Sequence, residues 1–162
     1  IAAGLAAFRG VARRQEVVGT FAGVTVVDDF AHHPTAVAGT LAALRARYPD
    51  RRLWAVFEPR SNTSRRRIFQ REYGDALAAA DRVIVGGVFQ KQSDAVDAEQ
   101  LFSPEQLVDD LTARGVAAQA IGDAAAIASA IAAAARPGDV VALMSNGAFG
   151  GLRARLVAAL GG

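Results

Sequence analysis

Short apolar segments alternate with segments of helical periodicity along most of this chain, and that alternation limits the folds it can adopt. RRLWAVFE at 51–58, RVIVGG at 82–87 and DVVALM at 139–144 each contain an unbroken apolar run beside polar or glycine residues. A strand that is apolar on both faces is typical of a parallel sheet, in which helices cover both sides. The sequence therefore predicts an α/β fold, a Rossmann-like and mostly parallel sheet with helices on both faces.

The segment before these runs predicts one exception to the parallel pattern. QEVVGTFAGVTVVDD at 15–29 holds two β-branched runs around Gly19, Thr20 and Gly23. Such runs on either side of a glycine-containing turn predict an N-terminal antiparallel hairpin. A further short strand is predicted for VAAQAI at 116–121.

Helices are predicted between the strands from apolar stripes at helical spacing and from capping residues. Their starts are predicted at Pro34, at Ser103 with Pro104 and the capping-box residue Gln106, and at Asp123. The helix that begins at Asp123 ends before Pro137 and Gly138. The apolar stripes are Val37, Leu41, Leu44 and Tyr48; Ile68, Phe69, Tyr73 and Leu77; Leu107 and Leu111; and Leu152, Leu156 and Leu160.

Composition bounds the class of protein. With 162 residues, of which 52% are hydrophobic, we expect one domain over residues 1–162 with a core of its own. The net charge of only +2 does not favour nucleic acid as a partner. The chain has no cysteine, which fits a cytoplasmic location, and no apolar run of the roughly 20 residues that cross a membrane. It begins with Ile1 rather than methionine, so we expect a domain of a longer protein.

Polar or glycine-rich segments follow four of the predicted strands. In a parallel sheet the carboxyl ends of the strands meet at one edge, where the N-termini of the following helices favour anions. We therefore expect these four segments to form a ligand-binding edge: DDFAHHPT, EPRSNTSRRR, GGVFQKQS and MSNGAFGG. The third continues into a polar stretch from Val88 to Gln100 that we predict to be a mobile loop.

The stretch VVDDFAHHPT at 26–35 contains both histidines of the chain, and three interpretations fit it. Asp28, Asp29, His32 and His33 are metal-ligand types and would suit a metal-dependent phosphoesterase. Two residues separate the aspartates from the histidines, however, and the chain has no third histidine, so we expect no metal site. The free N–H groups of the following helix would suit a phosphate or carboxylate. Alternatively, His33 caps that helix and His32 is simply solvated.

DDFAHHPT resembles DDYGHHPTE, a signature of the UDP-N-acetylmuramate:L-alanine ligases, and VARRQE upstream resembles their GRRF stretch. Together with FEPRSNT and MSNGAFGG, the set resembles more specifically the murein peptide ligase branch of the Mur ligase family. The resemblance covers nearly the whole chain, as the family's C-terminal domain. It implies an ATP-dependent ligase that joins the recycled tripeptide L-Ala-γ-D-Glu-meso-diaminopimelate to UDP-N-acetylmuramate through an acyl-phosphate intermediate.

The resemblance also implies which residues bind the nucleotide. Arg14 and Asp29 occupy the positions that contact it in the family, and Arg14 matches the motif better than Arg13 does. His32 and His33 would lie beside phosphate or substrate in the cleft between domains. These four residues are the predicted nucleotide site.

Two loops are implied to bind the substrate peptide. The first departs from the PHRYTRT pattern of the alanine-adding ligases and looks fitted to a peptide with several carboxylates, because arginine can clamp a carboxylate with two hydrogen bonds. Phe30 stands where those ligases have tyrosine, so a hydroxyl is missing there, and Gly150 and Gly151 would let backbone approach closely. The predicted substrate-binding residues are Arg60, Ser61, Asn62, Thr63, Ser145, Asn146 and Gly147. The arginines expected on a solvated helix face are Arg65, Arg66, Arg67 and Arg71.

The chain has no GxxxxGK[ST] phosphate-binding loop. The resemblance implies that this loop, the residues that hold Mg²⁺ with ATP and the UDP-sugar pocket lie in central and N-terminal domains absent from this chain. We therefore expect no catalytic residue here, and an isolated domain that is inactive but would close over ATP and position the peptide in the whole enzyme. Three alternatives stay open: a domain of an L-alanine ligase, a metal-dependent phosphoesterase and a non-enzymatic anion-binding module.

Overall fold

The computed structural model describes residues 12–88 and 100–161. Six strands form one sheet in the order β1-β2-β6-β3-β4-β5. The pair β1–β2 is antiparallel, and the other four neighbouring pairs are parallel. The predicted fold class, a mostly parallel α/β sheet with an N-terminal hairpin, is confirmed. The strands are β1 (Glu16–Phe21), β2 (Val24–Asp29), β3 (Leu53–Phe57), β4 (Arg82–Val85), β5 (Ala117–Ala120) and β6 (Val140–Met144).

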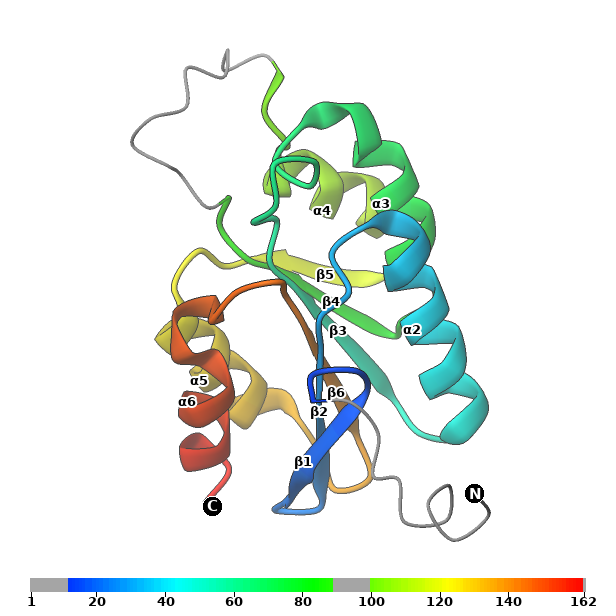
Figure 1. Ribbon diagram of the computed structural model, residues 1–162. Coiled ribbons are helices and arrows are strands. Elements are labelled where there is room, and N and C mark those ends of the chain that lie inside the picture. Colours follow the sequence, from blue (N-terminus) through cyan, green and yellow to red (C-terminus); the bar gives the residue numbers. More distant parts are fainter. Residues whose placement is uncertain (1–11, 89–99, 162) are drawn as a thin grey trace, which may run out of the picture.

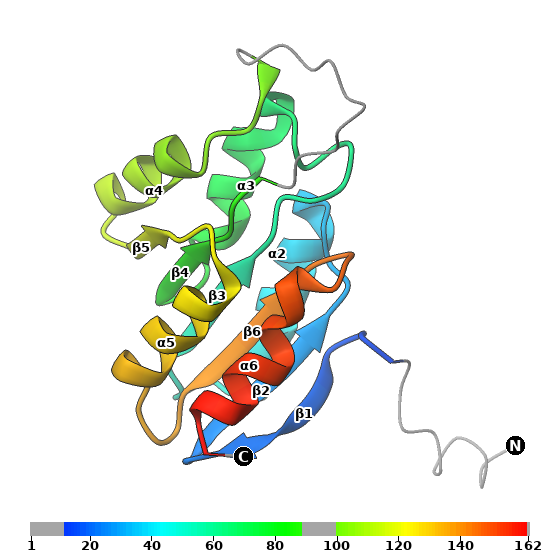
Figure 2. The same cartoon turned by 90° about the vertical axis from the view of Figure 1, so that its left-hand side faces the viewer.

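Helices cover both faces of the sheet (Figures 1 and 2). One face packs against α2, α3 and α4, and the other packs against α5 and α6. Successive residues of β3 serve the two cores in turn, since Ala55 and Phe57 belong to the first and Trp54 and Val56 to the second. This double burial explains why the strand is apolar at every position. The helices are α2 (Pro34–Arg47), α3 (Gln70–Leu77), α4 (Pro104–Ala113), α5 (Ala124–Ala134) and α6 (Leu152–Ala159).

Capping residues start the helices where the sequence predicts. Ser103 and Asp123 precede α4 and α5, and their side-chain oxygens accept backbone N–H groups at 3.1 and 2.8 Å. Pro34 and Pro104 occupy the first turns of α2 and α4. Each cap satisfies a backbone donor that the helix itself leaves without a partner.

Two local predictions about helices are wrong. The Gln106 side chain does not complete a capping box, because the backbone N–H of Ser103 donates to the side chain of Gln70 instead, at 3.1 Å. Ile68 does not join an apolar stripe: it lies in a short 3-10 turn before α3 and is 72% exposed. At Ser103 a contact between distant segments overrides the local pattern, and at Ile68 a tighter turn does so.

The strand β5 lies at an edge of the sheet and pairs with β4 alone. The short strand predicted for 116–121 is confirmed as β5, and its residues Ala117, Gln119 and Ala120 are exposed. The loop predicted between Val88 and Gln100 falls largely on residues 89–99, which lie outside the described residues. In the described part of the chain, no helix is both long and apolar enough to cross a membrane.

The strands β2, β6, β3 and β4 point the same way, so their carboxyl ends lie at one edge of the sheet (Figure 1). β6 comes last in the sequence but lies between β2 and β3. Its following loop therefore lies between the loops after β2 and β3, with α2 on one face of the sheet and α6 on the other. Such a change of side opens a crevice at the carboxyl edge, which is where ligands of doubly wound sheets bind. The predicted convergence of the strand exits is confirmed.

Candidate functional site

A buried carboxylate joins the loops that follow β3 and β6. Glu58 comes directly after β3 and is 7% exposed. The hydroxyl of Ser145, directly after β6, donates a hydrogen bond to Glu58 Oε2, and Arg60 Nη1 lies 3.8 Å from Glu58 Oε1. The backbone N–H of Gly147 donates to Ser145 Oγ at 2.9 Å. Because a buried carboxylate needs such partners, the two predicted substrate loops form one connected unit.

The side chain of Arg60 lies directly against Gly147. A Cβ atom at position 147 would come within 2.2 Å of Arg60 Nε, so the absence of a side chain there gives the arginine its place. In the same loop, Asn146 Oδ1 is buried and has no hydrogen-bond partner among the described residues. An acceptor in that state is available to a donor from a ligand or from water.

A cavity of about 610 Å³ opens beside this unit. Its lining includes two arginines, Arg60 and Arg155, and two carboxylates, Glu58 and Asp123. The Arg155 Nε atom donates to the carbonyl oxygen of Gly150 at 3.1 Å, which fixes its guanidinium beside the cavity. Equal numbers of opposite charges suit a ligand that carries both signs, whereas a phosphate would favour a surplus of positive charge.

Phe149 lines the same cavity in an unusual conformation. Its φ angle is 47°, in the left-handed region, although its ring is buried against β4. A Cβ at Gly86 would lie 2.8 Å from that ring, so the glycine leaves room for it. Left-handed backbone at a residue other than glycine costs of order 1–3 kcal/mol and is maintained by surrounding contacts, often at functional sites.

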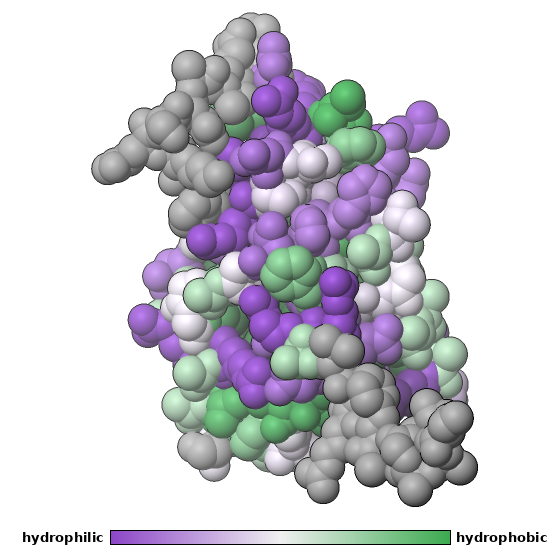
Figure 3. Space-filling model, in the orientation of Figure 1, coloured by the Kyte–Doolittle hydropathy of each residue, from purple (hydrophilic) through white to green (hydrophobic). Residues whose placement is uncertain are grey.

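The face that contains these strand ends is largely hydrophilic at its centre (Figure 3).

Asp29 is held by backbone groups on both sides. Its Oδ1 accepts from Ala31 N and its Oδ2 from Gln15 N, both at 2.7 Å, and it is 3% exposed. The backbone N–H of Phe30 also donates to Arg13 O at 2.8 Å. Asp29 therefore ties the segment before β1 to the end of β2. Its predicted contact with a nucleotide stays a prediction.

Of the two adjacent arginines, Arg13 lies in the loop cluster and Arg14 is exposed outside it. Arg13 Nη2 donates to the carbonyl oxygens of Ser145 and Gly147, at 2.6 and 2.8 Å. Both guanidinium carbons lie 5.4 Å from the centre of the Phe30 ring, within the range of a cation–π contact. Arg14 is accessible from solvent, and its nucleotide role stays a prediction.

The two histidines have different neighbours. His32 Nδ1 lies 2.9 Å from Phe30 O. His33 Nδ1 accepts from Thr35 N at 3.4 Å, which is the cap proposed as one alternative, and its ring packs edge-on against Phe69 at 5.2 Å. Within residues 12–88 and 100–161, no group of three or more His, Asp or Glu side chains is arranged to hold a metal ion.

The turn after Arg60 is built from the predicted substrate residues themselves. Ser61 Oγ accepts from Ser64 N at 3.0 Å, and Arg65 Nη2 donates to Asn62 Oδ1 at 2.9 Å. Arg65 is 4% exposed, so its assignment to a solvated helix face is wrong: the turn folds it inward. Thr63 is exposed. The other arginines assigned to the solvated face are exposed as predicted: Arg66, Arg67 and Arg71.

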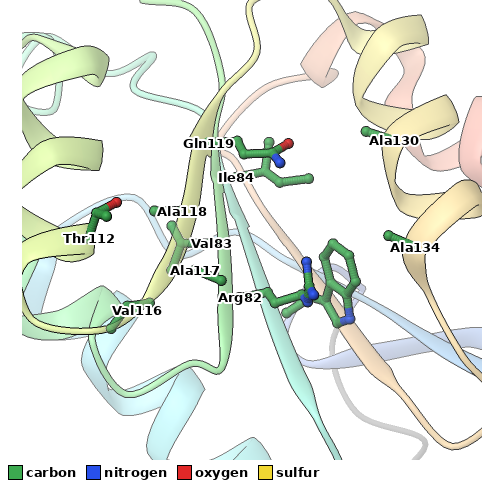
Figure 4. A pocket seen from close by; sticks show the side chains of 11 residues that line it. Arg82, Val83, Ile84, Thr112, Val116, Ala117, Ala118, Gln119, Ala130 and Ala134 are labelled. Carbon is green, nitrogen blue, oxygen red and sulfur yellow. The ribbon is translucent and has the colours of Figure 1, made fainter.

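A separate cavity of about 290 Å³ lies between the β4–β5 edge and α5 (Figure 4). The guanidinium carbon of Arg82 lies 5.1 Å from the centre of the Trp54 ring at this cavity. Arg82 is the first residue of β4, so the cavity lies toward the amino ends of the strands. It is not part of the carboxyl-edge site.

Sequence reasoning missed four charged residues of this site, Glu58, Arg13, Asp123 and Arg155. Glu58 carries a recognisable signal, because a lone carboxylate directly at the end of a buried strand needs a partner in the fold. Arg13 carries no such signal, since nothing in RR distinguishes the inward arginine from the outward one. Apart from Arg14, which precedes β1, the predicted site residues lie at the carboxyl edge, at the end of β2 and in the loops after β2, β3 and β6.

Comparison with known proteins agrees with this geometry. A family model described as "Mur ligase, glutamate ligase domain" matches residues 13–147. The match spans most of the chain and ends at Gly147, within the loop that follows β6. The chain belongs to the Mur ligase family and corresponds to its C-terminal domain.

Individual relatives refine this assignment. The chain is 44% identical over 160 residues to a UDP-N-acetylmuramate–L-alanine ligase of Mycobacterium sp. (strain JLS), covering 97% of this chain and 32% of the relative. A similar ligase of Chloroflexus aggregans is 39% identical, with 98% and 32% covered. The crystal structure of a murein peptide ligase from Psychrobacter arcticus 273-4 superposes with a TM-score of 0.78 at 34% identity, over 98% of this chain and 32% of that one. The chain thus spans about a third of the length of these relatives.

Proposed function

We propose that this chain is the C-terminal part of an ATP-dependent ligase that joins L-Ala-γ-D-Glu-meso-diaminopimelate to UDP-N-acetylmuramate and releases ADP and phosphate. The observation that carries this proposal is the Glu58–Arg60–Ser145 unit beside a cavity with charges of both signs. The diaminopimelate residue ends in an ammonium and a carboxylate on one carbon. Those two groups complement the cavity, whereas L-alanine has no such distal end.

In this proposal the chain binds and orients the peptide. Arg60 holds a peptide carboxylate, and Asn146 Oδ1 accepts from a peptide N–H or ammonium group. Held at both points, the peptide presents its free amine to the activated carboxylate of UDP-N-acetylmuramate. Positioning of this kind, rather than proton transfer by a residue of this chain, is its contribution to rate.

In this proposal ATP binds at the part of the carboxyl edge that Arg14 and the N-terminus of α2 form. Arg14 offers an exposed guanidinium to phosphate, and the N-terminus of α2 adds its dipole beside His33. Asp29 keeps the loop between them in place through its two backbone bonds. When bound, ATP supplies the phosphoryl group that activates the muramoyl carboxylate. The triphosphate and Mg²⁺ would be held mainly by domains outside this chain.

A second candidate is a ligase that adds L-alanine to UDP-N-acetylmuramate. The relatives at 44% and 39% identity are L-alanine ligases and favour it. The charged cavity favours the peptide, because alanine would leave Arg155 and Asp123 without a ligand group. Among the described residues no contact supports a metal-dependent phosphoesterase, since both carboxylate oxygens of Asp29 accept backbone N–H groups.

Competition between the two amine substrates tests the proposal. A longer protein that contains this chain is supplied with ATP, UDP-N-acetylmuramate and equal concentrations of tripeptide and L-alanine, and the products are separated by mass. Tripeptide product in excess supports the peptide ligase. An excess of alanine product establishes the second candidate, and no ligation of either substrate rejects both.

A further inference from the structure

Arg13 precedes β1 in the sequence, yet its side chain contacts the loop that follows β6. One nitrogen, Nη2, donates to two carbonyl oxygens of that loop, Ser145 O at 2.6 Å and Gly147 O at 2.8 Å. Its Nε lies 3.5 Å from Asp28 Oδ2 on β2. The guanidinium reaches the two carbonyls through Nη2 and Asp28 through Nε, whereas lysine carries one nitrogen that cannot lie at both places.

The two carbonyl groups that Arg13 contacts belong to Ser145 and Gly147, the first and last of the three predicted substrate residues in this loop. With the loop in this conformation, the N–H of Gly147 reaches Ser145 Oγ, and the Ser145 hydroxyl reaches Glu58. Gly147 is also the surface against which Arg60 lies. The position of Arg60, the residue proposed to bind a peptide carboxylate, therefore depends on the contacts of Arg13.

The backbone around Arg13 is held in a conformation that residues other than glycine rarely adopt. The φ angles of Arg13 and Gln15 are 56° and 47°, in the left-handed region. The N–H of Arg13 donates to Glu16 Oε2 at 2.8 Å, and the N–H of Gln15 donates to Asp29. Strain maintained by several converging contacts is typical of positions that serve a site.

We propose that Arg13 is a positioning residue that orients the Ser145–Gly147 loop for the peptide and couples this loop to the segment entering the sheet. The family resemblance assigns a nucleotide contact to its neighbour, Arg14, and gives Arg13 no role. The two adjacent arginines thus serve different substrates. The kinetic consequence rests on the proposed function, whereas the ordering of the loop does not.

Amide hydrogen exchange in the 162-residue chain tests the loop directly. Arg13→Lys keeps a positive charge, but its single nitrogen cannot serve the two carbonyls and Asp28 at once, so the loop loses its charge-assisted bonds when the ammonium pairs with Asp28. It should speed exchange of the Gly147 N–H roughly tenfold to a hundredfold, the range expected when a charge-assisted hydrogen bond is lost. Amides within β6 should exchange as in the wild type, and Arg14→Lys should leave Gly147 unchanged. Unchanged exchange at Gly147 in Arg13→Lys, or faster exchange throughout β6, overturns the proposal.

Steady-state kinetics in a longer, ligating protein test the consequence. Arg13→Lys should raise KM for the tripeptide about tenfold, equivalent to 1.4 kcal/mol, and change KM for ATP by less than about twofold. Arg14→Lys should instead raise KM for ATP and leave KM for the tripeptide within about twofold. Equal increases of both KM values in Arg13→Lys contradict a positioning role. If the wild-type protein ligates nothing, the proposed function fails, and hydrogen exchange alone decides the role of Arg13.

Discussion

Arg60 occupies the space that a side chain at position 147 would need, since a Cβ on Gly147 would lie 2.2 Å from Arg60 Nε and 2.3 Å from its Cδ. The two residues come from loops after different strands. Glu58, directly after β3, pairs with the arginine. The direction of the guanidinium is thus set by the backbone of a neighbouring loop. A change at either residue should alter peptide binding before it alters the fold.

Gly147→Ala should displace the Arg60 side chain and raise KM for the tripeptide by about tenfold or more in a ligating protein. KM for ATP should stay within about twofold. The matched control is Gly39→Ala in α2, where nothing lies within 4 Å of an added Cβ. That control should stabilise the chain by roughly 0.5–1 kcal/mol, because alanine is the better helix former. Equal peptide kinetics in both variants would contradict the steric argument.

Asp29→Asn should destabilise the chain by roughly 1–3 kcal/mol, because an amide can accept through only one oxygen and leaves a backbone donor without its partner. Urea unfolding followed by circular dichroism measures the change. Asp50→Asn, at an exposed position, should change stability by less than about 0.5 kcal/mol. If Asp29→Asn is as stable as the wild type but binds ATP less well, the carboxylate acts on the ligand rather than on the chain.

Asp139 should make the fold sensitive to acid. Its carboxylate accepts from the Arg52 side chain at 2.6 and 3.0 Å and from Trp54 Nε1 at 2.8 Å. Burial raises the pKa of Asp139, but hydrogen bonds from Arg52, the Arg136 backbone and Trp54 outweigh it and leave the pKa below the ordinary value of 3.8. The stabilisation is therefore complete above that value and is lost as pH falls through the lower, folded pKa.

Asp139→Asn should lower stability at neutral pH by about 3 kcal/mol, the lower end for breaking a buried ion pair. Below about pH 4 the difference from the wild type should shrink, since the wild-type carboxylate is then protonated as well. The exposed pair Arg114–Asp75, at 2.7 Å, supplies the control. Asp75→Asn should cost less than about 1 kcal/mol at any pH. A difference independent of pH would show that the Asp139 charge is not the cause.

Asp123 combines two roles that substitution can separate. Its Oδ2 caps α5 by accepting from Ala126 N at 2.8 Å, and the residue lines the charged cavity. Asp123→Ala should lower stability by about 1 kcal/mol, whereas Asp123→Asn should retain the cap. Both should raise KM for the tripeptide in a ligating protein. If Asp123→Asn leaves that KM unchanged, the carboxylate serves only the helix.

Much of the fold follows from local rules. The apolar runs around Trp54, Ile84 and Leu143 predict buried parallel strands because each run supplies both cores of the sheet. Parallel strands then bring their exits to one edge, which locates the site without any knowledge of its contacts. Ser103 and Asp123 mark helix starts because capping is a local hydrogen bond.

The parts that were missed depend on contacts between distant segments or on single backbone angles. Arg65 is buried because the turn at Ser61 folds it inward, and no periodicity reports that turn. The choice between Arg13 and Arg14 depends on a left-handed φ at Arg13, which residue type does not predict. Glu58 finds its partner Ser145 only when β6 lies beside β3.

The central place of β6 also has a consequence for how the chain folds. Ala142 pairs with Val27 on one side and with Ala55 on the other, so the last strand joins two parts made much earlier. Contacts over such separations are entropically costly to close and slow to form. A nascent chain that has not reached Met144 holds β2 and β3 with unpaired edges, which favour aggregation. The binding crevice therefore forms only after β6 has been synthesised, when insertion of one strand completes the sheet and the site in the same step.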